Sequence, residues 1–450
     1  MTNVFLLIID SFRSDKFYEK FISSENSNIS KLVKNGSFFS QTISTADATI
    51  LSWSGIFTSK FPFKTGIRSA RFNKLNKETT TCFDILKNFD YSFYGFLPKL
   101  SETIGLFPSF RNDDYLFDFY QGITNGLSEK IINLLESNKL KEPWFLISHS
   151  MDLHSPIEIS EKFNHENFGE TYYDKKISEI DFWLGKIIEK IDLSNTIVII
   201  TSDHGDYIQA IKKDDLLIDF HTNAETEITV SKIAGKIPGF LKPMKDKMFL
   251  LREKFSQERK SRIISKLNLK SHEKRALMSG KSDKDHFLFD EQIKVPLLFV
   301  GSDIPKNLQI TQQIRSVDIF PTIFDILDIK TKINFDGVSL KPLLNGNQIS
   351  EIPAYIESNP LVLTESNDVI GIRTSQYKYF RDKDDPKNRI HLFDLLEDPN
   401  ENNNISFNIE LVSKMENILQ NILKHNISEK FSNNDESDEI EQELRKLGYL

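Results

Sequence analysis

Cysteine is almost missing from this sequence. Cys82 is the only one among 450 residues, so an intramolecular disulfide and a thiolate metal cluster are both excluded. Because Cys82 begins the apolar segment Cys-Phe-Asp-Ile-Leu, we expect it to be a small buried residue. Long hydrophobic runs are missing too. The apolar stretch at residues 4–9 is far shorter than the roughly 20 residues that span a bilayer.

The sequence also has no excess of basic residues, and its first residues do not resemble a secretory leader. Its net charge is -8, which argues against a general nucleic-acid-binding protein, because such proteins present a net basic face. The first residues contain no basic start and no small-residue cleavage site. We therefore expect a cytoplasmic protein without a nucleic-acid partner, at most peripheral to a membrane.

The hydrophobic pattern is typical of an α/β protein. A chain of 450 residues is long enough for one large domain and a smaller one. Runs of branched apolar residues predict buried strands at 4–9, 196–200 and 295–300. Weaker strand candidates lie at 91–96 and 144–147. Helical periodicity lies between them, at 173–191 and 317–327. This alternation predicts a doubly wound, mostly parallel sheet within residues 1–360.

A different pattern begins at about residue 361. Short strands at hairpin spacing are expected at 369–374, 377–381 and 390–395, and a helix is expected at 409–423. These elements predict a small α+β subdomain in residues 361–450.

Residues 207–280 interrupt the α/β pattern and predict a basic, mostly helical insertion. Within 242–275 there are twelve lysines and arginines but only four acidic residues. One interpretation is a solvated helical hairpin packed on the rim. The other is a basic lid that attracts an anionic substrate, or an interfacial helix on anionic lipid.

Two acidic motifs follow predicted buried strands. Asp10 ends the first strand, and Asp203 with His204 follows the strand at 196–200. Open α/β sheets place their sites at the carboxyl ends of strands, and a buried carboxylate is costly unless it is paired or bound to a metal. The sequence therefore predicts one shared divalent cation on these three residues, with Mn, Zn, Ca or Mg as candidates.

The hydroxyl residues Thr45 and Thr49 lie just before a helix expected to begin near Leu51 or Ser52. A helix N-terminus favours anions. An alcohol nucleophile needs such activation because its own pKa makes it weak. The simpler interpretation is that Thr49 is only a helix cap.

At this point the chain resembles the sulfatase branch of the alkaline-phosphatase superfamily over nearly its whole length. Nine segments match the motifs of that family in order: 9–15, 57–67, 151–156, 201–206, 289–298, 316–322, 336–344, 392–403 and 444–450. The resemblance implies an alkaline-phosphatase-like fold and places Thr49 at the nucleophile position, counting back from Pro62. Family sulfatases have Cys-x-Pro-x-Arg there, with the cysteine converted to formylglycine. This chain has Thr49, Leu51 and Trp53 instead, so no formylglycine can form.

The resemblance also implies the remaining site residues. His154, in Asp-Leu-His-Ser-Pro, corresponds to an anion-binding or leaving-group histidine, and Asp152 would orient it or bind a second metal. His286 and Lys284 compete for the position of a residue that holds the substrate anion. Arg68 is a further candidate contact for the substrate, whereas His149 is expected to be a packed strand histidine.

Together these features predict a metal-dependent hydrolase of phosphate or sulfate esters. Thr49, and Asp10-Ser11 with the later Asp-His pair, resemble the pattern of family members that act on phosphate esters and phosphonates. The resemblance implies a phosphodiester or a phosphonate monoester, cleaved through a covalent intermediate on Thr49. A sulfuric-ester hydrolase and a phospho-alcohol transferase acting on an anionic glycan or lipid remain alternatives, as does a catalytically weak binding protein. Peripheral membrane contact through 242–275 and a homo-oligomer are also left open.

Overall fold

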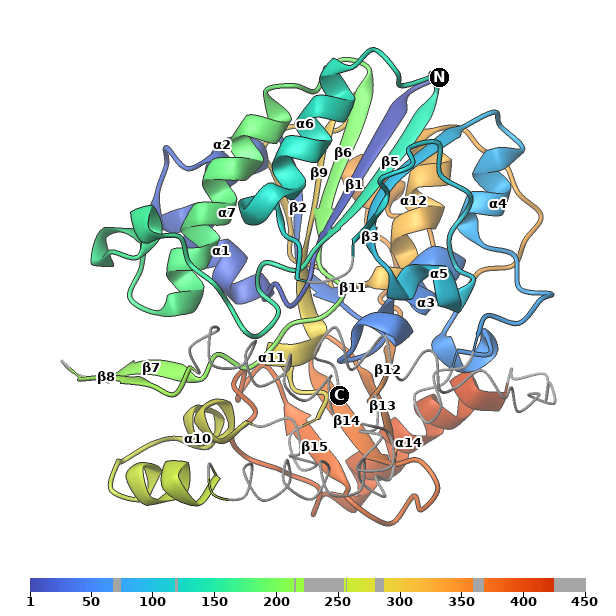
Figure 1. The fold of residues 1–450 in the computed structure, drawn as a ribbon. Helices are drawn as coiled ribbons and strands as arrows, with labels where there is room; N and C mark the ends of the chain where they lie inside the picture. The colour runs from blue at the N-terminus through green and yellow to red at the C-terminus, as the bar shows by residue number, and fades with distance from the viewer. Residues whose placement is uncertain are drawn as a thin grey trace, which may run out of the picture.

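The computed structural model describes residues 1–67, 74–117, 120–213, 216–221, 255, 257–279, 287–358 and 368–424. Figure 1 shows a large sheet between two layers of helices, with a second, smaller sheet beneath it. This arrangement confirms the predicted α/β class with a C-terminal antiparallel part.

Nine strands of the described residues form the large sheet, in the order β10-β2-β9-β6-β1-β5-β3-β4, with β11 also paired to β2. Their bounds are β1 Asn3–Ile9, β2 Gly36–Ile43, β3 Ser92–Pro98, β4 Leu116–Phe117, β5 Trp144–Ser150, β6 Thr196–Thr201, β9 Lys294–Gly301, β10 Leu308–Ile310 and β11 Ile314–Arg315. Strand β1 lies in the middle, parallel to both β5 and β6. Strand β9 departs from the parallel pattern because it runs antiparallel to β2 and β6.

Both faces of the large sheet are buried. Along β1, alternate side chains enter two separate cores: Val4, Leu6 and Ile8 face one, and Phe5, Leu7 and Ile9 face the other. This explains why the strand is apolar throughout instead of alternating. The first core is covered by α3 Thr49–Thr58, α4 Cys82–Lys87, α5 Leu100–Ile104, α12 Ile319–Ile326 and α13 Lys341–Leu344. The second is covered by α1 Ser14–Ser23, α2 Asn28–Lys34, α6 Ser128–Glu136 and α7 Tyr172–Ile188. The doubly wound prediction is confirmed.

The smaller sheet is antiparallel, in the order β12-β13-β14-β15. Its strands are β12 Ala354–Glu357, β13 Val369–Arg373, β14 Tyr377–Asp382 and β15 His391–Asp394, and α14 Ile409–Lys424 packs against them. The sheet begins at residue 354, ahead of the boundary drawn at 360/361 from the sequence, and that boundary stays a prediction.

Only part of the 207–280 insertion lies within the described residues. It contains the hairpin β7 Ala210–Lys213 and β8 Leu216–Asp219, a helical segment at 257–264, and α10 Ser271–Met278. The hairpin was not expected in a mostly helical insertion. Residues 242–254 and the last matching motif, at 444–450, lie outside the described residues.

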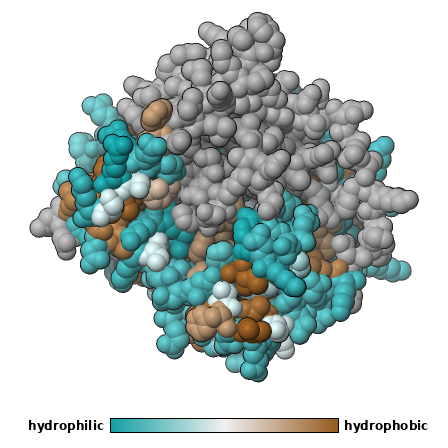
Figure 2. Space-filling view, turned by 90° about the horizontal axis from the view of Figure 1, so that it is seen from below, coloured by the Kyte–Doolittle hydropathy of each residue, from teal (hydrophilic) through white to brown (hydrophobic). Residues whose placement is uncertain are grey.

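The surface seen from below, in Figure 2, is mostly hydrophilic where the structure describes it, with small hydrophobic patches. Leu396 and Phe407 are among the exposed large hydrophobic residues of the described chain. Within the part of the chain that the structure describes, no helix is both long and apolar enough to cross a bilayer. The interfacial-helix interpretation of 242–275 stays a prediction.

Candidate active site

Asp10 lies immediately after β1, in the middle of the sheet and completely buried. Its backbone N–H donates to the Ser150 carbonyl at the end of β5, at 2.8 Å. The next residue, Ser11, has a φ of 61°, in the left-handed region that residues with side chains rarely adopt. This turn brings the Ser11 hydroxyl within 2.6 Å of Asp10 Oδ1, so the chain folds back around the carboxylate.

Asp203 and His204 follow β6, the parallel neighbour of β1. One ligand atom from each of Asp10, Asp203 and His204 lies within 4.8 Å of the other two. The two sequence motifs, almost 200 residues apart, therefore meet at one edge of the sheet, as the strand ends predicted. Gly205 is required here for space, since an added Cβ would lie 2.2 Å from the Glu291 carbonyl oxygen.

The donor set of this triad fits a divalent cation. His204 Nδ1 lies 2.7 Å from the Gly205 carbonyl oxygen, so Nδ1 carries the proton and Nε2 is the nitrogen that can bind a metal. Asp203 Oδ2 is buried and has no hydrogen-bond partner among the described residues. A buried carboxylate oxygen without a partner is costly, and a cation would satisfy it.

Charges within the triad change the pKa values of its members. Burial raises the pKa of Asp10, but the hydrogen bond from His149 and the charges of His154 and His204 lower it far more. The net pKa of Asp10 lies well below the ordinary value. Burial lowers the pKa of His204, but the carboxylates of Asp203 and Asp10 raise it to about 9. Asp10 therefore stays ionised and the site holds a proton on His204, which a bound cation would displace.

Thr49 is the first residue of α3, so the helix begins about two residues earlier than expected from the sequence. Ala48 occupies the cap position and makes no side-chain cap bond. The Thr49 hydroxyl instead faces the triad, 3.3 Å from Asp10 Oδ2 and 3.2 Å from His204 Nε2. The interpretation of Thr49 as a simple helix cap is wrong, because its hydroxyl contacts the acidic site.

His154 lies near this group and is buried, with its ring centroid 5.4 Å from that of the half-buried Tyr120. Its positive charge is among the causes that lower the pKa of Asp10. His154 is therefore close enough to Asp10 for their charges to interact. Its role with the leaving group stays a prediction.

Asp152 is used within the fold. Its carboxylate accepts hydrogen bonds from the backbone N–H groups of Ile123 and Thr124 and from the hydroxyls of Thr124 and Ser150. The Lys176 ammonium lies 3.4 Å away. These contacts tie β5 to the segment before α6, so the carboxylate has the surroundings of a structural anchor. Its predicted role, to orient His154 or to bind a second metal, stays a prediction.

Three predicted substrate contacts, Arg68, Lys284 and His286, lie outside the described residues. Their proximity to Thr49 is still a prediction.

One residue of the site was missed. His149, expected to be a packed strand histidine, is indeed fully buried on β5, but its Nε2 lies 3.2 Å from Asp10 Oδ2. Its register partner on β1 is Ile8. The available signal was a histidine close to the carboxyl end of an apolar strand.

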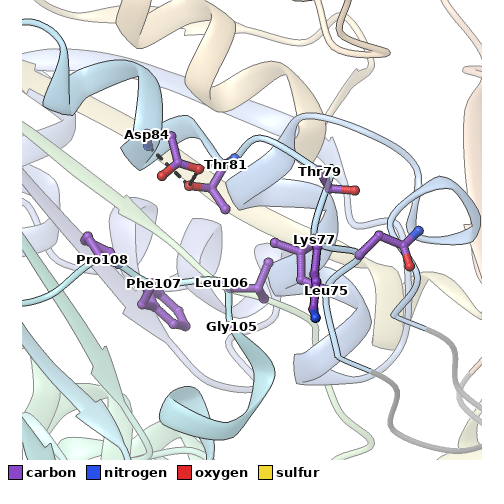
Figure 3. Close-up of a pocket in the computed structure, with 10 residues that line it drawn as sticks. Leu75, Lys77, Thr79, Thr81, Asp84, Gly105, Leu106, Phe107 and Pro108 are labelled. Carbon is purple, nitrogen blue, oxygen red and sulfur yellow. Dashed lines mark hydrogen bonds between the residues drawn. The ribbon is translucent and has the colours of Figure 1, made fainter. Parts of the chain in front are cut away.

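The chain also has a cavity of about 310 Å³, and Figure 3 shows residues that line it. It lies between the segment at 75–84 and the segment at 105–108. Two of its polar residues, Thr81 and Asp84, form the capping box of α4. None of the triad residues lines this cavity, so we do not place the chemistry there.

Two family models match the chain. The model described as Sulfatase matches residues 2–329, and the model described as N-sulphoglucosamine sulphohydrolase, C-terminal, matches residues 280–430. The second match covers the smaller antiparallel sheet and α14. Together the two models span both parts of the fold.

Curated relatives match over a shorter stretch. Arylsulfatase K of Rattus norvegicus is 32% identical over 125 residues, which are 26% of this chain and 22% of that protein. A sulfatase of Formosa agariphila is 23% identical over 131 residues, which are 29% of this chain and 24% of that protein. The matched stretches are therefore only about a quarter of the length of these relatives.

Solved structures match over almost the whole fold. The phosphonate monoester hydrolase of Agrobacterium radiobacter has a TM-score of 0.63 at 15% identity, with 94% of this chain and 95% of that one covered. A 2-O GAG sulfatase has a TM-score of 0.61 at 16% identity, with 94% and 92% covered. At such identities these likenesses establish the fold alone. The match of the first family model to more than two thirds of the sequence establishes that this chain belongs to the sulfatase family.

Proposed function

We propose that this chain is a metal-dependent ester hydrolase that uses Thr49 as its nucleophile, with a phosphodiester or a phosphonate monoester as substrate. One observation carries the proposal. The Thr49 hydroxyl, at the N-terminus of α3, lies 3.3 Å from Asp10 and 3.2 Å from His204 within a buried Asp-Asp-His group. An alcohol placed between a carboxylate and an imidazole at a helix N-terminus has the surroundings that an activated nucleophile needs.

The residues of the chain divide the work. Asp10, Asp203 and His204 would hold the cation, which would polarise an ester oxygen and favour the ionised form of the Thr49 hydroxyl. Asp10 accepts the hydrogen bond of that hydroxyl and so fixes its orientation. The N-terminus of α3 favours negative charge on Thr49 Oγ1 as the proton leaves.

The covalent step balances as a displacement at phosphorus. The Thr49 hydroxyl releases its proton to solvent, the bond from Oγ1 to phosphorus forms, and the bond from phosphorus to the leaving oxygen breaks. His154 is the proposed donor of the proton that the leaving oxygen takes up. Water then attacks phosphorus in the covalent Thr49 ester, which returns a proton to Oγ1 and releases a phosphate monoester or a phosphonic acid, and His154 regains its proton from solvent.

Phosphorus esters are the first choice because Thr49 cannot supply the aldehyde that a cysteine-derived formylglycine provides. A sulfuric ester is the second candidate, and its support is the identity of 32% with an arylsulfatase. A transferase would differ only in the second step, where an alcohol in place of water would accept the group from Thr49.

The proposal is tested by a substrate panel on the Mn²⁺-loaded protein, with Thr49→Ala as the matched blank. The panel contains an aryl sulfate, a phosphate monoester, a phosphodiester and a phosphonate monoester. We expect turnover of the last two that disappears in the blank. Preference for the sulfate would overturn the choice of phosphorus. No turnover of any ester, together with no cation binding, would favour a binding protein.

A further inference from the structure

We infer that His149 is a positioning residue of the cation site, which holds the Asp10 carboxylate in the orientation that binds the cation. The inference rests on the cation site of the proposed function. His149 lies outside the segments that match the family motifs, and its contacts reach β1 and α3.

His149 donates the hydrogen bond that joins it to Asp10. His149 Nε2 lies 3.2 Å from Asp10 Oδ2, and both side chains are completely buried. A carboxylate oxygen at this distance accepts, so Nε2 carries a proton and donates it. His149 Nδ1 has no hydrogen-bond partner among the described residues, so no acceptor there competes for the proton. The contacts therefore fix the tautomer that Asp10 requires.

Two donors control the plane of the Asp10 carboxylate. Rotation about the last torsion of an aspartate is broad, so a carboxylate that must present one oxygen to a metal needs support. Ser11 Oγ holds Oδ1 at 2.6 Å, while His149 holds Oδ2. With a donor on each oxygen, the Asp10 carboxylate has one preferred plane. Outer-shell donors of this kind orient metal ligands in many proteins.

The ring of Trp53 packs against the His149 imidazole and holds it in place. The indole ring of Trp53 stands almost perpendicular to the imidazole, at an angle of 88° with the centroids 4.8 Å apart. Trp53 lies on α3, the helix that begins with Thr49. Trp53 also occupies the position where the family motif has an arginine. In this chain the helix of the proposed nucleophile therefore contacts Asp10 through Trp53 and His149.

The test is the Mn²⁺ affinity of the full chain, measured by titration calorimetry. His149→Gln places its amide nitrogen about where Nε2 lies, whereas the amide nitrogen of His149→Asn lies about where Nδ1 lies. We expect His149→Asn to bind Mn²⁺ about 10- to 100-fold more weakly than the wild type, the range for lost outer-shell donors. We expect His149→Gln to regain most of the lost affinity.

A matched control separates positioning from packing. Ile147→Ala, two residues earlier on β5, opens a cavity in a fully buried position whose register partner is Leu6. It should lower the melting temperature yet keep the wild-type Mn²⁺ affinity. If His149→Asn keeps the wild-type Mn²⁺ affinity, or if the Asn and Gln variants lose equal affinity, the positioning role of His149 is wrong. The proposed function would not be affected by either result. A wild-type chain that binds no divalent cation would overturn both this inference and the proposed function.

Discussion

Replacing Thr49 by alanine should abolish turnover while the cation site stays intact. The change removes Oγ1 and one methyl group from a residue that is 2% exposed. The lost methyl costs about 1 kcal/mol of stability, and the lost hydrogen bond to Asp10 costs about 1 kcal/mol. A domain with a stability of roughly 5–15 kcal/mol should remain folded after such a loss.

The expected effect on catalysis is much larger than this structural cost. Without a nucleophile the covalent route is closed, and we expect kcat to fall by at least about 10⁴-fold, which corresponds to about 5 kcal/mol of barrier. Mn²⁺ affinity should be unchanged, since Asp10, Asp203 and His204 are retained. Thr49→Ser is the matched control, because it keeps the hydroxyl and should keep measurable turnover.

The assay has two readouts that together decide the question. Steady-state turnover of a phosphodiester compares the wild type, Thr49→Ser and Thr49→Ala at saturating Mn²⁺. Mass spectrometry of acid-quenched enzyme seeks a phosphoryl group on the peptide that contains Thr49. Turnover by Thr49→Ala at the wild-type rate would refute the reasoning, and so would an adduct on another residue.

Three further predictions concern other parts of the molecule. Asp203→Asn removes the charge of the carboxylate whose Oδ2 has no hydrogen-bond partner among the described residues. We expect the Mn²⁺ affinity measured by calorimetry to fall by at least about 100-fold. An unchanged affinity would exclude Asp203 as a ligand. Burial, partly offset by the charge of Lys378, raises the pKa of Glu401 from 4.5 to about 7. As pH rises, the unfolded chain therefore releases this proton before the folded protein does. The free energy of unfolding falls as pH rises between these two values. From pH 5.5 to 7.5 the wild type should lose about 2 kcal/mol of unfolding free energy relative to Glu401→Gln, and parallel urea-derived curves for the two proteins would contradict this. Leu419→Ala empties a fully buried position of α14 and should cost about 2–5 kcal/mol in the same urea assay, while a smaller loss would show that α14 contributes little to the packing of the smaller sheet.

The sequence predicts the middle of the large sheet well because each central strand is buried on both faces. Strands β1, β6 and β9 each contain a run of mostly apolar residues, so their position is visible without any partner. Their directions are not visible in the same way. The direction of β9 relative to β6 depends on the path by which the insertion returns the chain to the sheet. Either direction would place the same apolar residues in the same core, so the apolar pattern does not distinguish them. The β7–β8 hairpin was missed for a similar reason, since its burial pattern is mostly exposed or half-buried.

The residues of the candidate site, too, could be predicted only in part from the sequence. Asp10 and Asp203 could be predicted because each follows an apolar strand directly, and the end of a parallel strand lies at a known edge of the sheet. His149 could not be placed from sequence alone, because its contact with Asp10 depends on the register of β5 against β1. A shift of one residue would turn its side chain to the opposite face of the sheet. The actual register pairs Ile8 with His149, and Trp53 on α3 then packs against the imidazole. The residue that we infer to position the cation ligand is therefore defined by strand pairing, which no local motif encodes.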